Sequence, residues 1–356
     1  MKDIKVVILT ANLGKGHNII ANNLQFEIDK QLNIKTFVID YFKLYNLYID
    51  KIASKWYRMV LQNFPLIYKI EYSLFIDKSG IPKNKTNMLA ISNLKKIIGE
   101  DLSNVILISV FPNATLGTAK IKCKRKYTIV TDYGIHRRWI SKNIDGYFVA
   151  NKQIKDILIK NNINKNKIHI TGIPVAKKFY KKLNKTYLKK KFGIKNANKT
   201  ILIMGGGDGV MKDPIQIIKA LANKYNILFV AGTNKRLKSR IDNLKISNCF
   251  TFGFTDKIKE LIDVSDLVIS KAGGISITEF AVSHLPIIIY KINPGQEYDN
   301  IKYFLSNNAC LVIKNINELK KSVDDIIRKK MNLNMNLIDT KTPAIDKIIQ
   351  YLKKDI

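Results

Sequence analysis

The sequence of 356 residues carries 61 lysines and arginines against 28 aspartates and glutamates, a formal net charge of +33 at pH 7. Hydrophobic residues make up 46% and charged residues 25%, which excludes a disordered or collagen-like chain. The length predicts two domains of about 150 residues each. The positive charge favours an anionic partner, such as nucleic acid, a phosphorylated ligand or an anionic lipid surface, although a lysine-rich genome would produce the same balance.

Cysteine spacing and hydropathy limit the compartment. Cys123, Cys249 and Cys310 are too far apart for a disulfide framework or a CxxC metal site, which indicates a reducing cytoplasm. The N-terminus is too short and polar for a signal peptide, and no apolar stretch reaches the roughly 18 to 20 residues that span a bilayer. We therefore expect any membrane association to be peripheral. The sequence has no HExxH or DxD motif, so we also expect no metal or other cofactor.

The chain opens with a strand, a glycine loop, a helix and a second strand. The apolar run 6–10 leads into Gly14-Lys15-Gly16-His17, a helical pattern covers residues 18–32, and a strand follows at 36–39. This order predicts a βαβ unit with parallel strands. Further buried strands are predicted at 105–110, 127–131 and 147–150.

An aromatic and basic stretch, residues 51–75, interrupts these strands. Trp56 lies on an apolar stripe at helical spacing, and Lys55 and Arg58 flank that stripe. The stretch is either a core helix of the first domain or an amphipathic helix that lies in a lipid interface, with the tryptophan at the level of the headgroups.

The second half repeats the α/β pattern after a lysine-rich passage. Residues 176–200 lack periodicity and are interpreted as a linker between a domain at 1–175 and a domain at 201–342. Strands are predicted at 201–204, 227–230, 267–270 and 287–290, and a last helix falls within 343–356. Two parallel α/β domains, each with glycines at the carboxyl end of a strand, predict a ligand held in the cleft between them.

Two groups of residues in the first half are candidates for chemistry. Gly14 and Gly16 permit close approach of a ligand to a helix start, but the spacing fits neither a P-loop nor a dinucleotide fingerprint. His17 is either a general base or a polar residue of the first helical turn. Asp132 follows a buried strand, where it reaches the carboxyl edge of the sheet or caps a turn. His136 and Trp139 share its loop.

The segment 271–300 is the richest in the second half. Gly273 and Gly274 expose a helix N-terminus that suits a diphosphate, and Glu279 suits a ribose diol. The alternative for Glu279 is a capping box with Ser276. After the next strand come three residues that supply the donors and acceptors sugar hydroxyls need: Gln296, Glu297 and Asn300.

Five motifs in this order resemble those of the processive diacylglycerol β-glucosyltransferases and monogalactosyldiacylglycerol synthases, which are family 28 glycosyltransferases. More distantly, they are similar to the N-acetylglucosaminyltransferase that completes lipid II. The motifs are 9–12 with 14–17, 130–132 with His136 and Trp139, 170–174, Gly273-Gly274 with Glu279, and 294–297 with Asn300. The likeness runs from about residue 5 to about residue 315. Ala272 replaces the usual proline, and the loop 205–209 is richer in glycine than is usual and contains Asp208.

The resemblance implies a GT-B fold, with two Rossmann-like domains facing across a cleft and a final helix that crosses back to the first. It implies inverting, metal-independent transfer of a hexose, with glucose favoured, from a UDP-sugar to diacylglycerol at the cytoplasmic membrane face. Repeated addition to one lipid is an option. The alternatives are a UDP-galactose-dependent monogalactosyldiacylglycerol synthase and a UDP-N-acetylglucosamine transferase that acts on a lipid-linked cell-wall precursor.

The resemblance also implies roles for individual residues. His17 and Asp132 are the candidates for the base, with His17 favoured. The residues expected to bind UDP are Gly16, Gly207, Gly273, Gly274 and Glu279, and those expected to bind the hexose are Gln296, Glu297 and Asn300. The residues expected to contact acceptor or membrane are His136, Trp139, Trp56, Lys55 and Arg58.

Two other classes fit parts of the sequence. A nucleic-acid-binding module would suit the charge, but the usual binding motifs are missing, so we expect no nucleic acid partner. A Rossmann oxidoreductase would suit the fold, but both glycine loops lack the fingerprint and its ribose carboxylate. The expected partners are a UDP-sugar, diacylglycerol and an anionic membrane surface.

Overall fold

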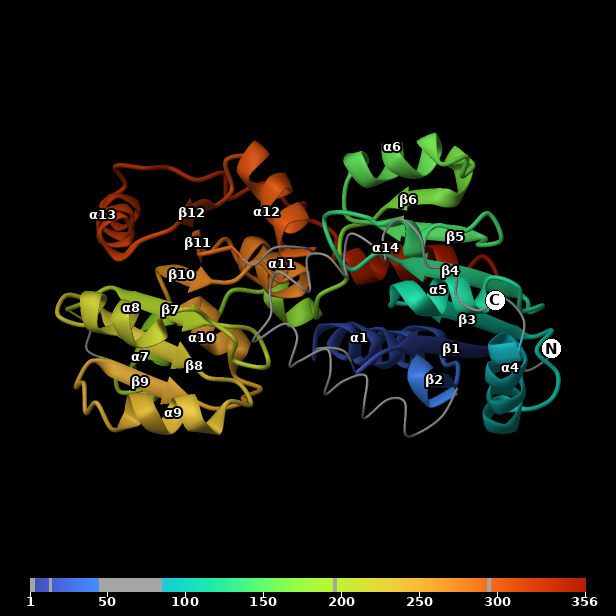
Figure 1. Ribbon diagram of the computed structural model, residues 1–356, viewed down its shortest axis with the longest axis horizontal. Coiled ribbons are helices and arrows are strands. Elements are labelled where there is room, and N and C mark those ends of the chain that lie inside the picture. The colour runs from blue at the N-terminus through green and yellow to red at the C-terminus, as the bar shows by residue number, and fades with distance from the viewer. Residues whose placement is uncertain (1–3, 13–14, 45–84, 195–196, 293–295) are drawn as a thin grey trace. The chain divides into compact units, whose positions relative to one another are not determined.

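The computed structural model describes residues 4–12, 15–44, 85–194, 197–292 and 296–356 (Figure 1). The chain divides into two compact units: Met1–Ala176 with Thr342–Ile356, and Lys177–Lys341. The predicted amphipathic segment, with Lys55, Trp56 and Arg58, lies outside the described residues. Within the described ranges, no helix combines the length and hydropathy needed to cross a membrane.

A six-stranded parallel sheet forms the centre of the first unit. Its order is β2-β1-β3-β4-β5-β6, and its interior strands are largely apolar and buried on both faces, except at the amino ends of β1 and β4. The strands are β1 (Lys5–Thr10), β2 (Thr36–Asp40), β3 (Val105–Ser109), β4 (Arg125–Ile129), β5 (Gly146–Val149) and β6 (Ile168–Ile170). Before residue 176, the helices in the described ranges are α1 (Lys15–Leu32), α4 (Lys85–Ile98), α5 (Pro112–Thr118) and α6 (Lys152–Lys160), with short 3-10 turns η1 (Tyr41–Leu44), η2 (Arg137–Trp139) and η3 (Lys165–Lys167).

The last helix of the chain, α14 (Ala344–Leu352), belongs to the first unit and is drawn in red in Figure 1. Its apolar side chains recur at helical spacing and are buried, as Ile345 and Ile348 show. Polar contacts hold both ends: Gln31 Nε2 donates to Asp346 Oδ1 at 3.0 Å, and Arg125 Nε lies 3.0 Å from Asp355 Oδ1. The helix therefore completes the first domain although it follows the second in sequence.

The second unit is built on another parallel sheet of six strands, in the order β12-β11-β10-β7-β8-β9. Its strands are β7 (Thr200–Met204), β8 (Asn226–Val230), β9 (Cys249–Phe252), β10 (Leu267–Ser270), β11 (Ile287–Tyr290) and β12 (Leu311–Ile313). The helices and turn around them are η4 (Lys177–Tyr180), α7 (Lys185–Lys191), α8 (Pro214–Leu221), α9 (Lys235–Asp242), α10 (Ile258–Val264), α11 (Gly274–Val282), α12 (Gln296–Ser306) and α13 (Ile316–Ile327).

Each sheet has one point at which the strand order reverses. Counted from β7, the second sheet runs 3-2-1-4-5-6, the Rossmann order, and it reverses between β7 and β10. In the first sheet the reversal lies between β1 and β3. At such points the connections leave in opposite directions, which opens a crevice beyond the carboxyl ends of the strands. The two reversal points therefore mark where each domain can hold a ligand.

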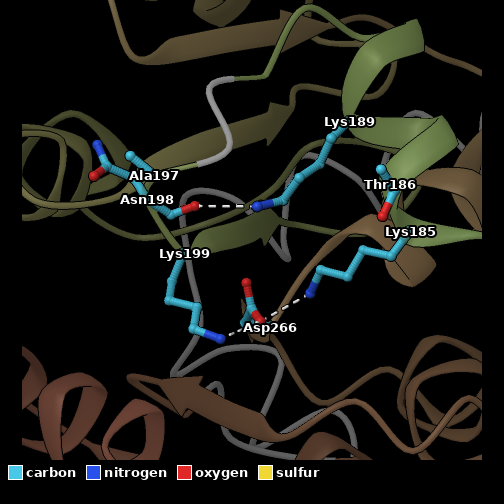
Figure 2. A pocket seen from close by; sticks show the side chains of 7 residues that line it. All are labelled: Lys185, Thr186, Lys189, Ala197, Asn198, Lys199 and Asp266. Carbon is cyan, nitrogen blue, oxygen red and sulfur yellow. Dashed lines mark hydrogen bonds and ion pairs between the residues drawn. The ribbon is translucent and has the colours of Figure 1, made fainter.

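The lysine-rich passage 176–200 differs from the linker that its composition suggested, because it supplies η4 and α7 to the second unit. Its lysines find carboxylates: Lys185 Nζ lies 2.8 Å from Asp266 Oδ1, and Lys191 Nζ lies 2.8 Å from Glu260 Oε2. Figure 2 shows Lys185 and Lys199 reaching Asp266 from opposite sides. These contacts hold the segment against α10 and the amino end of β10.

Candidate active site

His17 lies in the first turn of α1, at the reversal point of the first sheet. Its Nδ1 is 2.8 Å from the carbonyl oxygen of Val110, which follows β3. A carbonyl oxygen can only accept, so Nδ1 carries the hydrogen and Nε2 keeps a lone pair. The Phe111 ring meets the imidazole edge-on, with ring centroids 5.4 Å apart. These contacts fix the ring with Nε2 as its basic nitrogen.

The surroundings keep His17 neutral. Burial lowers its pKa from 6.5 to about 4, against the smaller opposite effect of the hydrogen bond to Val110. The side chain is therefore in its base form at pH 7, as proton abstraction requires.

The loop after β4 lies next to this histidine. Thr131 Oγ1 is 3.3 Å from His17 Nδ1, and Asp132, the next residue, is buried. The structure thus brings the segment that carries Asp132 to the start of α1. Both residues predicted as candidates for the base lie at the carboxyl edge of the same sheet.

Trp139 and His136, which the sequence suggested as acceptor or membrane contacts, lie in the loop between β4 and β5. Trp139 is fully buried in a cluster with Val130 and Tyr147, because its large apolar ring fills the space beside β5. Its side chain packs in the core of the first unit. The His136 ring lies 6.3 Å from that of Trp139, and burial, followed by the charge of Arg138, lowers the pKa of His136 to about 4.

In the second unit, helix α11 begins without a side-chain cap. Its N-cap is Gly273, and a Cβ added there would meet nothing within 4 Å. The first amides of a helix have no intrahelical acceptor, so an uncapped start can bind an anion. Ser276 is the third residue of the helix and not its N-cap, so the capping box proposed for Ser276 and Glu279 is wrong.

Glu279 lies in the second turn of α11 and is 8% exposed. Burial raises its pKa to about 8, against the opposing charge of Lys178. Its carboxyl group is therefore protonated at pH 7 when no ligand is bound. A protonated carboxyl can donate one hydrogen bond and accept others, which matches a vicinal diol.

Polar contacts join the loops at the reversal point of the second sheet. Ser270 Oγ donates to the carbonyl oxygen of Met204 at 2.8 Å, which links the ends of β10 and β7. The Asn300 amide donates to the carbonyl oxygen of Ala272 at 3.1 Å, and Lys271 Nζ lies 3.2 Å from Glu297 Oε1. The start of α12 is thereby tied to the loop that leads into α11.

These contacts divide the residues expected to bind the hexose. Asn300 is buried, and its amide nitrogen donates to the loop before α11, so it positions this loop. Glu297 lies in the first turn of α12, beside Lys271. Gln296 is the first residue of that helix, and its side chain is not among those described.

Of the glycines expected to bind UDP, Gly207 packs against another loop. Its carbonyl oxygen accepts from Thr233 N at 3.0 Å, and a Cβ on Gly232 would lie 2.3 Å from that oxygen. The glycines after β7 therefore let two backbones touch. Gly16 lies in the first turn of α1 in the first unit, whereas the other glycines expected to bind UDP belong to the second.

Two cavities of the second unit lie at the other edge of its sheet. One, of about 350 Å³, is lined by Lys185, Lys189, Lys199 and Asp266 (Figure 2), and the second, of about 400 Å³, is lined mainly by apolar residues. Asp266 precedes β10, so both cavities lie at amino ends of strands, away from the reversal point. No group of three or more His, Cys, Asp or Glu side chains in the described part of the chain is arranged to hold a metal ion.

Comparisons with known proteins agree with this geometry. The family model of monogalactosyldiacylglycerol synthases matches residues 17–175, and that of the glycosyltransferase family 28 C-terminal domain matches residues 181–352. A processive diacylglycerol β-glucosyltransferase of Bacillus pumilus (strain SAFR-032) is 30% identical over 99% of this chain and 94% of its own. The chain belongs to the diacylglycerol glycosyltransferases of glycosyltransferase family 28.

Solved structures agree on the fold of the glycosyltransferase. HepE of Anabaena in complex with UDP-glucose aligns with a TM-score of 0.57 at 12% identity, over 99% of this chain and 100% of its own. MurG of Acinetobacter baumannii aligns with a TM-score of 0.57 at 13% identity, over 99% of each chain. The two Rossmann-like domains are those of the GT-B fold.

Sequence reasoning assigned no role to several residues that contact the candidate site residues. Val110 and Thr131 orient His17, Lys178 faces Glu279 from η4, and Lys271 pairs with Glu297. Thr131 is the last residue of a predicted strand and Lys271 directly follows another, so their positions were an available signal. The carbonyl oxygen of Val110 carries none.

Proposed function

We propose that this enzyme transfers glucose from UDP-glucose to diacylglycerol, with inversion at the anomeric carbon and without a metal ion. The observation that carries the proposal is the uncapped start of α11, with the buried Glu279 on the same helix, at the reversal point of the second sheet. The chain is also 30% identical to a diacylglycerol β-glucosyltransferase over nearly its whole length, which supports the same donor and acceptor.

The second domain binds the donor in this proposal. The amides that follow Gly273 bind the diphosphate, and Glu279 binds the ribose diol. Gly207 and Gly16 add backbone contacts to UDP. Glu297 and Gln296 bind hexose hydroxyls, and Asn300 holds the loop beneath them.

The first domain supplies the base. Nε2 of His17 takes the proton of the diacylglycerol hydroxyl as its oxygen bonds to the anomeric carbon. The bond from that carbon to the diphosphate breaks on the opposite face, UDP leaves, and an α-linked donor gives a β-linked product. Asp132 is the second candidate for the base, and it can also orient the acceptor. The reaction requires the carboxyl edges of both sheets to bring their substrates within bonding distance.

The lipid substrate requires contact with a membrane. We propose peripheral association with the cytoplasmic face of the cell membrane through the segment that contains Lys55, Trp56 and Arg58. Basic residues and a tryptophan on one amphipathic stretch match anionic headgroups and the interfacial region.

The proposed function is tested by incubating the enzyme with UDP-glucose, UDP-galactose or UDP-N-acetylglucosamine and diacylglycerol vesicles. We expect β-glucosyldiacylglycerol as the main product, with further sugars if the enzyme is processive. Faster transfer from UDP-galactose would favour the second candidate, a monogalactosyldiacylglycerol synthase, which the family match over residues 17–175 supports. No glycolipid from any donor would refute the proposal.

The roles of the two candidate bases separate in the same assay. We expect His17→Ala to lower kcat by about 10² to 10⁴, because general base catalysis contributes about that factor. Asp132→Asn should lower kcat less and raise the KM for diacylglycerol. Near-wild-type kcat in His17→Ala, with a large loss in Asp132→Asn, would assign the base to Asp132.

A further inference from the structure

Lys271 lies at the reversal point of the second sheet, directly after β10. Its side chain runs along the loop that follows β7: a Cβ added to Gly206 would lie 3.0 Å from Lys271 Cε. Gly206 also has a φ of +73°, which favours glycine. Both the backbone conformation and the contact with Lys271 therefore disfavour any side chain at residue 206. Because Gly206 has no side chain, the aliphatic part of Lys271 can pack between the loop after β7 and the loop after β10.

The ammonium group ends beside a carboxylate that is only half satisfied. Lys271 Nζ lies 3.2 Å from Glu297 Oε1. The other oxygen, Oε2, is buried and has no hydrogen-bond partner among the described residues. A buried acceptor without a donor costs free energy, so this pair gains stability if a ligand supplies a hydroxyl to Oε2.

The lysine also lies two residues before Gly273, the N-cap of α11. The same short segment therefore carries a positive charge and the first amides of an uncapped helix. The Lys271 side chain is 30% exposed, and its stem has the rotatable bonds to turn from Glu297 toward a ligand at the helix start. A diphosphate at that start would offer the ammonium two or more anionic oxygens in place of one carboxylate oxygen.

We propose that Lys271 exchanges partners when the donor binds: it leaves Glu297 and binds the diphosphate of the UDP-sugar. The exchange frees both carboxylate oxygens of Glu297 to accept hydrogen bonds from hexose hydroxyls. When the bond between the anomeric carbon and the diphosphate oxygen breaks, the electron pair stays on UDP, and Lys271 stabilises the added charge. This inference rests on the proposed function, because it requires a nucleoside diphosphate donor.

The test compares the binding of uridine, UMP and UDP by isothermal titration calorimetry. We expect Lys271→Met to weaken UDP binding by about 10- to 100-fold, the usual worth of a charge-assisted hydrogen bond, and to leave uridine binding within about twofold. Lys271→Arg keeps the charge and should retain most of the UDP affinity. The matched control is Lys302→Met, which removes one charge from an exposed position on α12 and should change neither affinity.

A second variant tests the exchange itself. Glu297→Gln removes the competing partner of Lys271, so we expect it to bind UDP as tightly as wild type or more tightly, and to lose the affinity that glucose adds in UDP-glucose. Equal weakening of uridine and UDP by Lys271→Met would show a structural role and overturn the inference. Unchanged UDP binding in Lys271→Met would overturn it as well. Wild type that binds no UDP would instead refute the proposed function.

Discussion

The Glu279 carboxyl is an ionisable group kept neutral by its position inside a helix. Its pKa of about 8 lies above the ordinary value of 4.5, because burial outweighs the nearby charge of Lys178. Between these two pH values the folded protein holds a proton that the unfolded chain has lost. Folding stability therefore falls as the pH rises from about 4.5 to about 8. The glutamate that suits a ribose diol also lowers the stability of its own domain at neutral pH.

Glu279→Gln should expose this opposition between stability and binding. We expect the variant to gain stability relative to wild type as the pH rises, with little difference at pH 5 and a gain on the order of a few kcal/mol at pH 9. Urea denaturation at both pH values measures this. UDP affinity at pH 7 should fall at least tenfold by calorimetry. Glu318→Gln, at an exposed residue of α13, is the control whose difference from wild type should not change with pH. A gain that is equal at pH 5 and pH 9 would contradict the prediction.

The sequence predicted the positions of the candidate site residues only in part. His17, Asp132, Gly273 and Glu279 follow strands in the chain, so their place at a carboxyl edge was predictable. Burial was not: a tryptophan in a loop suits an interface as well as a core, and only the packing around β5 places Trp139 inside. The spacing of Ser276 and Glu279 matches a capping box, but this motif does not determine that α11 begins at Gly274.

Among the secondary-structure elements, the interior strands and the edge strand β2 were predictable, whereas the other three edge strands were not. Every strand that the sequence predicted is present, with bounds that differ by at most two residues. The strands that it missed, β6, β9 and β12, all lie at edges of the sheets. Interior strands are buried on both faces and read as continuous apolar runs. The three missed strands are short and partly exposed, so their apolar signal is weak.

The glycine loops around the second sheet should separate folding from binding. We expect Gly273→Ala to cost less than about 1 kcal/mol of stability, because a Cβ there meets open space, and to weaken UDP binding at least tenfold. Gly232→Ala should cost roughly 2–4 kcal/mol, because its Cβ would collide with Gly207 and φ is +56°. Denaturation and UDP titration of both variants measure these effects. UDP binding of wild-type strength in Gly273→Ala would place the diphosphate elsewhere.

Helix α14 should contribute to the stability of the first domain by packing. We expect Ile348→Ala to destabilise that domain by about 2–5 kcal/mol, since the side chain is fully buried. Gln350→Ala, on the exposed face of the same helix, should change stability by less than about 0.5 kcal/mol. Chemical denaturation compares the two. Equal and small effects would show that the helix is only loosely attached.

At the scale of the whole molecule, the sequence predicted two parallel α/β domains and a returning helix, and both are present. The lysine-rich passage shows why composition alone misplaces a boundary. Lysine stems pack against apolar surface while their ammonium groups reach carboxylates, so a segment without periodicity can still belong to a domain. The lysines that pair with carboxylates in the second unit contribute nothing to the net charge of +33, which is the excess of basic over acidic residues.

The membrane proposal predicts a localised electrostatic effect. Reversing Lys55 and Arg58 to Glu should weaken sedimentation with anionic vesicles by more than tenfold at low salt, since each basic residue near such a surface contributes about 1 kcal/mol. Reversing Lys320 and Lys321, two exposed residues of α13, makes the same change in net charge and should have a much smaller effect. Equal losses in both double variants would show that total charge, and not this segment, determines binding.

The return of α14 means that the second domain is an insertion within the first. The first domain ends its main run at Ala176 and resumes at Thr342, and a Cβ on Gly172 would lie 3.4 Å from Ala344 Cβ. The two cut ends of the first domain are therefore neighbours. A short peptide that joins residues 176 and 342 should therefore yield the first domain as a continuous chain without the second. Because the chain passes between the two domains twice, proteolytic cleavage at one of these connections would leave the other connection intact.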